Sequence, residues 1–233
     1  MARLPRLYAP GLTQLVIAEL VKDSNGVSPA LSPSLLKDLL VLLGDASKSY
    51  HVAIHGWVVT SSSIALLVTP TDAQGVSKLM QTLGRNLAAR LKSGSVFSGR
   101  YHSTLLEPGA WVLPALIWLE WLPVRAGLTQ DPEQWAWSSA ATHTGHQGQH
   151  TPWLEQHIDY WACGNTPFDR QDRYRTLLQE GNASSVEQKI TSSLNGQWAL
   201  GSELFLQSLS EHASRRVQPG VRGRPKKRTT AVN

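Results

Sequence analysis

The chain is poor in cysteine, in long apolar runs and in the short motifs that mark several enzyme classes. Cys163 is its only cysteine, which excludes a disulfide framework within the chain and indicates a reducing compartment. No run of about 18 apolar residues occurs, and none follows Arg3 and Arg6, so we expect no membrane span, no signal peptide and a cytoplasmic location. A glycine-rich phosphate loop, a Gly-x-Ser-x-Gly elbow and a Cys-x-x-Cys pair are also missing.

The composition is that of a globular protein with a basic tail. Hydrophobic residues make up 41% and charged residues 17% of the 233 residues, enough for one core and an appendage. The net charge is +5, but seven bases and no acid lie between residues 215 and 228, so the rest of the chain carries −2. These bases are Arg215, Arg216, Arg222, Arg224, Lys226, Lys227 and Arg228.

Hydrophobic periodicity predicts a β-α-β-β-α-β order in the first half of the chain. Alternating apolar residues predict strands over 12–20, 51–59, 63–69 and 97–106. A helix with Ser32 as its cap and Pro33 in its first position follows the first strand, and a second helix, capped by Ser77, follows the third strand. This order predicts an α+β, ferredoxin-like antiparallel sheet with helices on one face. The fold alone decides no function.

Four segments describe the domain organisation. Residues 1–140 form the sheet domain, whose third helix, over 107–121, is expected to kink at Pro114. An irregular connection follows over 141–168, and apolar periodicity returns in a small helical C-terminal part over 169–214. The basic tail, 215–233, has no such periodicity and is expected to be disordered.

Five segments in chain order resemble one protein family. The stretch from Ile117 to Gly127 is similar to RYIELNPVRAG, and the other four matches are residues 1–6, 80–85, 99–103 and 135–139. Together they resemble the REP-associated tyrosine transposases, the single-tyrosine branch of the His-hydrophobe-His transposases. The resemblance implies DNA transposition, with single-stranded or hairpin DNA as the partner and Mg²⁺ or Mn²⁺ as the metal.

The resemblance also implies where the chemistry would lie. In the family a tyrosine hydroxyl attacks the DNA strand, and two strand histidines and a helix asparagine hold the metal. The family pattern HAYVLMPNHVHLLLTP aligns without a gap from His55 onward, so the histidine positions fall on Ser63 and Ala65. Trp118 falls on the tyrosine and Leu122 on the asparagine. Indole has no nucleophilic oxygen, and alanine and leucine have no donor atom. The sequence therefore predicts a DNA-binding member with no intact catalytic residue or metal ligand, and no cofactor.

Two alternatives remain open. The first is an active, metal-dependent strand-cleaving enzyme with displaced residues: Tyr101 as nucleophile, and His51 or His55, which share one strand face, as metal ligand. The second is a regulatory binder that acts through the tail alone. His55 is interpreted as structural, because the family carries its equivalent outside the metal site.

Basic residues are the candidate DNA contacts. Arg85 and Arg90 on the second predicted helix, and Arg100 after it, are placed to contact phosphates. The sequence Arg-Gly-Arg-Pro-Lys-Lys-Arg over 222–228 resembles an AT-hook, whose extended arginines enter the narrow minor groove of A·T-rich duplex DNA. Its candidate contacts are Arg222, Arg224, Lys226, Lys227 and Arg228.

A histidine-rich segment precedes Cys163. Its members, His143, His146, His150 and His157, are loosely spaced, and we interpret the segment as a solvated loop rather than a zinc site.

Overall fold

The computed structural model describes residues 5 to 220, apart from 24, 27, 29, 30, 147 and 150. His150 and the five AT-hook-like bases from Arg222 to Arg228 lie outside the described residues. No helix in the described ranges is long and apolar enough to cross a membrane.

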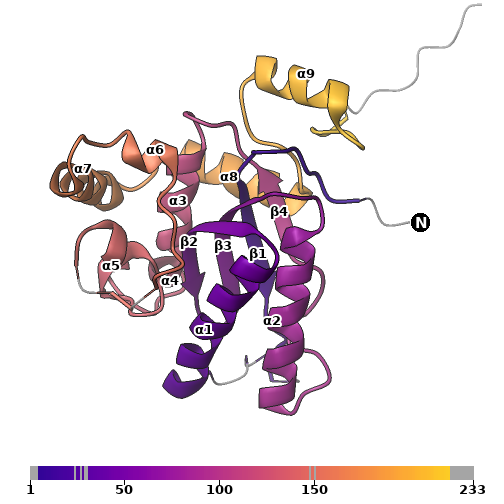
Figure 1. The fold of residues 1–233 in the computed structure, drawn as a ribbon, viewed down its shortest axis with the longest axis vertical. Helices are drawn as coiled ribbons and strands as arrows, with labels where there is room; N and C mark the ends of the chain where they lie inside the picture. Colours follow the sequence, from indigo (N-terminus) through magenta and orange to yellow (C-terminus); the bar gives the residue numbers. More distant parts are fainter. Residues whose placement is uncertain are drawn as a thin grey trace, which may run out of the picture.

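The predicted β-α-β-β-α-β order is confirmed, and its strands form one antiparallel sheet in the order β2-β3-β1-β4 (Figure 1). The strands are β1 (Gln14–Glu19), β2 (Val52–Val59), β3 (Ser63–Pro70) and β4 (His102–Leu105). The strand β4 is shorter than predicted, because Phe97 makes only an isolated bridge with Leu20 and the backbone over 98–100 bends. The fold is therefore of the expected α+β class.

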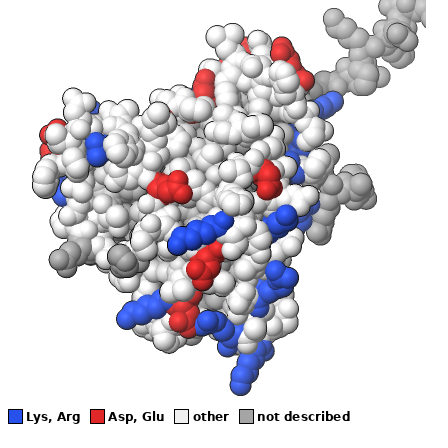
Figure 2. All heavy atoms as spheres, viewed as in Figure 1, with Lys and Arg blue, Asp and Glu red and all other residues white. Residues whose placement is uncertain are grey.

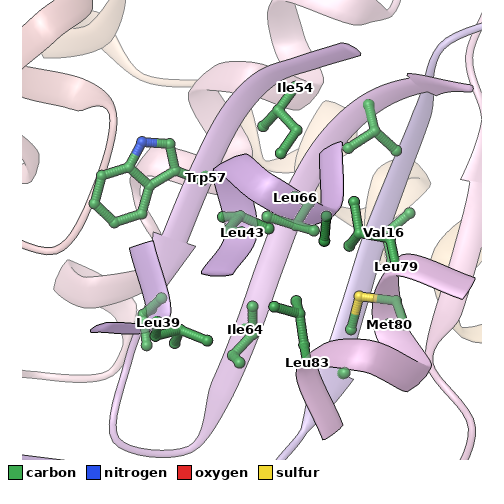
Figure 3. Close-up of a cluster of buried hydrophobic side chains, with 14 of the residues drawn as sticks. Val16, Leu39, Leu43, Ile54, Trp57, Ile64, Leu66, Leu79, Met80 and Leu83 are labelled. Carbon is green, nitrogen blue, oxygen red and sulfur yellow. The ribbon is translucent and has the colours of Figure 1, made fainter. Parts of the chain in front are cut away.

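Two helices, α1 (Pro33–Ser49) and α2 (Gly75–Leu91), cover one face of the sheet. Their apolar faces meet alternate side chains of the strands, as Figure 3 shows for Leu43, Leu79, Leu83, Ile64 and Leu66. These residues are almost completely buried, and burial of each such side chain contributes about 1.5–3 kcal/mol relative to exposure.

The two helices begin differently. Ser32 caps α1 as predicted, its hydroxyl accepting from the N–H of Leu35 at 3.2 Å. The predicted cap of α2 is wrong. Its helix begins at Gly75, two residues before Ser77, and the carboxylate of Asp72 accepts from the N–H of Gly75 at 2.8 Å.

A second core lies on the opposite face of the sheet. There α3 (Val112–Glu120), α7 (Pro167–Glu180) and α8 (Ser184–Gly196) pack against Leu15, Ala65 and Leu67. Both faces of β3 are therefore buried, which explains why the sequence of this strand is almost continuously apolar. Because α7 and α8 share this core with the sheet, the C-terminal part packs as an extension of the sheet domain.

The start of α3 and the chain that follows the helix differ in detail from the prediction. The helix begins only at Val112, so Pro114 lies in its first turn, where a missing N–H breaks no helical hydrogen bond, and the predicted kink there is wrong. After Trp121 the chain makes one more short helix, α4 (Leu122–Arg125). Gly127 then takes a left-handed turn, with φ of 68°, a conformation that glycine adopts without steric cost.

The segment predicted as irregular, 141–168, contains two short helices, α5 (Ala140–His143), which begins one residue before it, and α6 (Ile158–Trp161). A 3₁₀ turn, η1 (Pro132–Gln134), precedes the segment. The last helix, α9 (Glu203–His212), packs in a small third core with Leu7, Leu105 and Val217. Between residues 167 and 212, where a small helical part is expected, the chain forms the three helices α7, α8 and α9.

Candidate functional site

The four positions that the resemblance identifies lie on one face of the sheet, the face toward α3. Ala65 and Trp118 belong to the same buried core, and Leu122 packs against it. Ser63 and Ala65 point to this face because they alternate with Ile64 along β3. The structure thus brings strand positions and helix positions together, although they are more than fifty residues apart in the sequence.

A cleft of about 480 Å³ opens at this place. Ser63 and Leu122 both line it, with Glu19 and Lys22 as the charged groups. Glu19 stands directly opposite Ser63 across the ladder between β1 and β3. A second cleft, of about 590 Å³, shares Glu19 with the first and continues over His102, Arg100 and Arg215. Together they make a groove along the α3 face of the sheet.

The donor atoms at this site do not fit a divalent metal. Ala65 and Leu122 have no ligand atom, and the hydroxyl of Ser63 is engaged with the hydroxyl of Thr60 at 3.0 Å. Among the described residues, no group of three or more His, Cys, Asp or Glu side chains is placed to hold a metal ion.

The contacts of Trp118 are those of a buried structural residue. Its ring is buried, and the guanidinium carbon of Arg125 lies 4.7 Å from the ring centroid. Arg125 also donates to the backbone carbonyl of Trp118 and pairs with Glu187 on α8 at 2.9 Å. Arg125 therefore ties the end of α3 to α8 at the position where the family carries its nucleophile.

The displaced residues of the alternative site do not come together. Tyr101 lies at the β4 edge of the sheet, whereas His51 and His55 lie at the β2 edge, with β3 and β1 between them. Three strand spacings amount to about 14 Å. His51 is exposed in the turn before β2 with φ of 50°, so the expectation that it shares a strand face with His55 is wrong. Burial raises the pKa of Tyr101, whose hydroxyl bonds to that of Ser77 at 3.0 Å.

His55 belongs to a buried chain of neutral groups. His55 donates from Nδ1 to the carbonyl of Glu155 at 2.8 Å and accepts at Nε2 from the hydroxyl of Thr69 at 2.9 Å. Thr69 accepts from Thr13 at 2.8 Å, and Thr13 accepts from Nε2 of His157 at 3.0 Å. Desolvation lowers the pKa of His55 to about 4. The interpretation of His55 as structural agrees with these contacts.

The histidine-rich segment is not a solvated loop at its two ends, so that expectation is wrong there. His143, at the end of α5, is 1% exposed and donates from Nδ1 to Glu120 at 2.7 Å. His157 takes part in the chain just described, while His146 is exposed and pairs with Glu133 at 2.8 Å. The thiol of Cys163 is partly exposed, and burial raises its pKa.

Glu120 is the centre of a buried network that the sequence reading did not identify. Its carboxylate accepts from the hydroxyls of Ser139 at 2.6 Å and Tyr174 at 2.7 Å, as well as from His143. Burial and the nearby Glu120 raise the pKa of Tyr174 well above its ordinary value. The sequence does contain one indication of this buried network. Glu120 is the only charged residue between Pro108 and Val124, and a lone charge in an apolar stretch is buried only when it has partners.

The predicted phosphate contacts separate into two groups. Arg85 and Arg100 line one pocket of about 570 Å³ beside α2, together with Arg6. Arg90 instead pairs with Asp38 on α1. Figure 2 shows Lys and Arg side chains gathered along the right-hand side of this view, over α2.

Comparison with known proteins places the fold. No protein-family model and no curated protein matches the sequence. Solved structures do match. A REP-associated tyrosine transposase bound to a REP hairpin is 13% identical, with a TM-score of 0.51 over 67% of this chain and 93% of that one. A crystal structure of a protein assigned as a transposase from Deinococcus radiodurans is 16% identical, with a TM-score of 0.35 over 55% of this chain and 94% of that one. The first likeness shows a shared fold, and the second carries no argument.

Proposed function

We propose that this protein binds DNA, as a hairpin or an adjoining single strand, on a tyrosine-transposase fold, and that it does not cleave the strand. One observation carries the proposal. The positions where the family has its chemistry meet on one face of the sheet: Ser63 and Leu122 line the cleft, and Ala65 and Trp118 are buried in the core against which Leu122 packs. The fold still brings these positions together, but they hold no nucleophile and no metal ligands. This supports a protein that still binds DNA but has lost strand cleavage and transfer.

The groove supports DNA as the partner. It leads from the cleft at Ser63 past Glu19 to Arg100 and Arg215. The guanidinium carbon of Arg215 lies 5.4 Å from the ring centroid of Trp198, which lines the same groove. Arginines beside an aromatic ring are suited to a single strand, because they contact phosphates while the ring can stack on a base.

The basic tail is proposed as an additional contact. The sequence after residue 220 carries five bases and no acid, so it would add affinity that is independent of sequence and sensitive to salt. A truncation should begin at residue 221, because Val217 is buried and its carbonyl accepts from the N–H of Ala199 at 2.8 Å. Removal of 221–233 leaves this contact intact.

The test combines binding and cleavage. The full chain is mixed with labelled hairpin DNA that carries a single-stranded extension, in Mg²⁺ or Mn²⁺, and run on native and denaturing gels. We expect a salt-sensitive mobility shift and no covalent adduct, and we expect the chain lacking 221–233 to retain part of the shift. A covalent adduct would show that cleavage survives. The absence of any shift would refute DNA binding, and a shift lost entirely on truncation would assign binding to the tail alone.

A further inference from the structure

The pocket beside α2 has the composition of an anion site. It lies between α2 and the segment over 94–101 that leads into β4. Arg6, Arg85 and Arg100 reach it from three separate parts of the chain. Among the described residues that line it, none is Asp or Glu. Three guanidinium groups without a carboxylate between them favour a bound anion, and phosphate suits their planar donor geometry best.

Arg6 is already held in place for such a ligand. Its guanidinium carbon lies 3.5 Å from the centroid of the Tyr101 ring, and it donates to the carbonyl of Tyr101 at 3.4 Å. Its Nε atom is buried and has no hydrogen-bond partner. Tyr101 is held in turn by Ser77, so the arginine is stacked on a fixed ring. A phosphate oxygen beside Arg6 would offset the desolvation that lowers the pKa of this group.

Besides the arginines and the polar residues Ser77, Gln81 and Ser95, the pocket has an apolar part that suits a flat group. Met80 and Val96 are buried in the core below it, and the ring of Phe97 lies partly exposed among the lining residues. Gly84 lies directly against this ring, since a Cβ there would be 3.0 Å from the ring atom Cε2. A volume of about 570 Å³ is within the range of small-molecule sites, which runs from roughly 300 to 1,000 Å³.

The pocket is joined to the groove on the other face of the sheet. Arg100 and Gly99 line both the pocket and the cleft over His102. That cleft shares Glu19 and Ser98 with the cleft at Ser63. A single strand lying in the groove can therefore continue around the β4 edge of the sheet, past Arg100, and reach the pocket.

We propose that this pocket holds one unstacked nucleotide of the bound DNA strand, with its base against Phe97 and Met80 and its phosphate on Arg6, Arg85 and Arg100. The proposal rests on the proposed function, because the strand is the one that occupies the groove. It differs from a general basic surface in requiring particular arginines: Arg85 and Arg100 contribute, and Arg90 does not.

The test uses a matched pair of variants on one helix. Arg85→Gln removes a pocket arginine, and Arg90→Gln removes an arginine five residues along α2 that pairs with Asp38. Binding of a fluorescent oligothymidylate to the full chain is measured by anisotropy, with melting temperatures to confirm folding. We expect Arg85→Gln and Arg100→Gln each to weaken binding by about tenfold, and Arg90→Gln by about twofold or less, since a charged phosphate contact exceeds a general screening effect.

Two further measurements separate the pocket from the overall function. Thymidine 5′-monophosphate should raise the melting temperature of the wild-type chain and not that of Arg85→Gln. Equal weakening by all three substitutions, or no response to the nucleotide, would overturn the pocket proposal. Hairpin binding that survives Arg85→Gln and Arg100→Gln unchanged would overturn it while leaving DNA binding in place. Stabilisation by the nucleotide without any hairpin binding would support the pocket and refute the proposed function.

Discussion

Acidification should destabilise the protein through His55, well above the pH range in which most carboxylates titrate. His55 is 7% exposed and is neutral in its chain with Thr69 and the carbonyl of Glu155. The ring of His157 lies 4.9 Å away edge-on, and Asp159 is next to His157. Burial lowers the pKa of His55 to about 4, chiefly by desolvation, against an ordinary value of 6.5. The unfolded chain therefore binds a proton that the folded chain excludes.

The size of the effect follows from this difference. Because the folded pKa is the lower one, His55 contributes no penalty above pH 6.5, and stability is lost as pH falls from 6.5 toward 4. The full difference corresponds to about 3 kcal/mol, of which about 2 kcal/mol is lost by pH 5. His157, whose pKa burial also lowers, acts in the same direction.

The assay is urea unfolding of the wild type, His55→Gln and His51→Asn between pH 7.5 and 5. His55→Gln is less stable at neutral pH but loses less on acidification, since it has no group to protonate at this position. His51→Asn is the control, because His51 is an exposed histidine in a left-handed turn that asparagine tolerates. The reasoning fails if the stability of the wild type is constant over this range, or if His55→Gln follows the same pH profile as the wild type.

Three other substitutions test the site and its support. Glu120→Ala should lower the free energy of unfolding in urea by about 3 kcal/mol or more, because it leaves buried donors without an acceptor; these are Ser139, His143 and Tyr174. A loss below about 1 kcal/mol would contradict this network. Gly44→Ala should lower the melting temperature, because the alanine Cβ would lie 2.3 Å from the indole of Trp153. Such overpacking lowers the free energy of unfolding by about 1–3 kcal/mol. An unchanged melting temperature would show that the indole moves freely. Trp118→Tyr should form no covalent adduct with hairpin DNA, because a tyrosine there still has no metal ligands beside it, and an adduct absent from Trp118→Phe would refute this.

The local signals in the sequence were sufficient for the fold. Periodicity and the Ser32 cap located the four strands and the first two helices, because each of these elements buries one regular face. The starts of α2 and α3 were predicted less well. Asp72 caps α2 from outside the helix, and Pro114 is compatible with a first helical turn, so in both places the local pattern allows more than one starting residue.

The candidate site was predicted only in part. Alignment identified Ser63, Ala65, Trp118 and Leu122, but their meeting on one face of the sheet depends on α3 packing across β3. The pocket formed by Arg6, Arg85 and Arg100 was not foreseen as a unit, because its arginines come from three separate segments. Arg85 and Arg90 look equivalent on one helix, and only the neighbouring α1 gives Arg90 a partner.

The sequence by itself determined the element order, the buried faces of the strands and first helices, and the residue types at the four aligned positions. These depend on contacts within a few residues or on chemical identity, which the chain carries locally. Only the tertiary structure decided which arginines are paired, which histidines are buried and how the clefts connect. His143 and His146 stand three residues apart, yet one is buried on Glu120 and the other is exposed, because their environments come from distant segments.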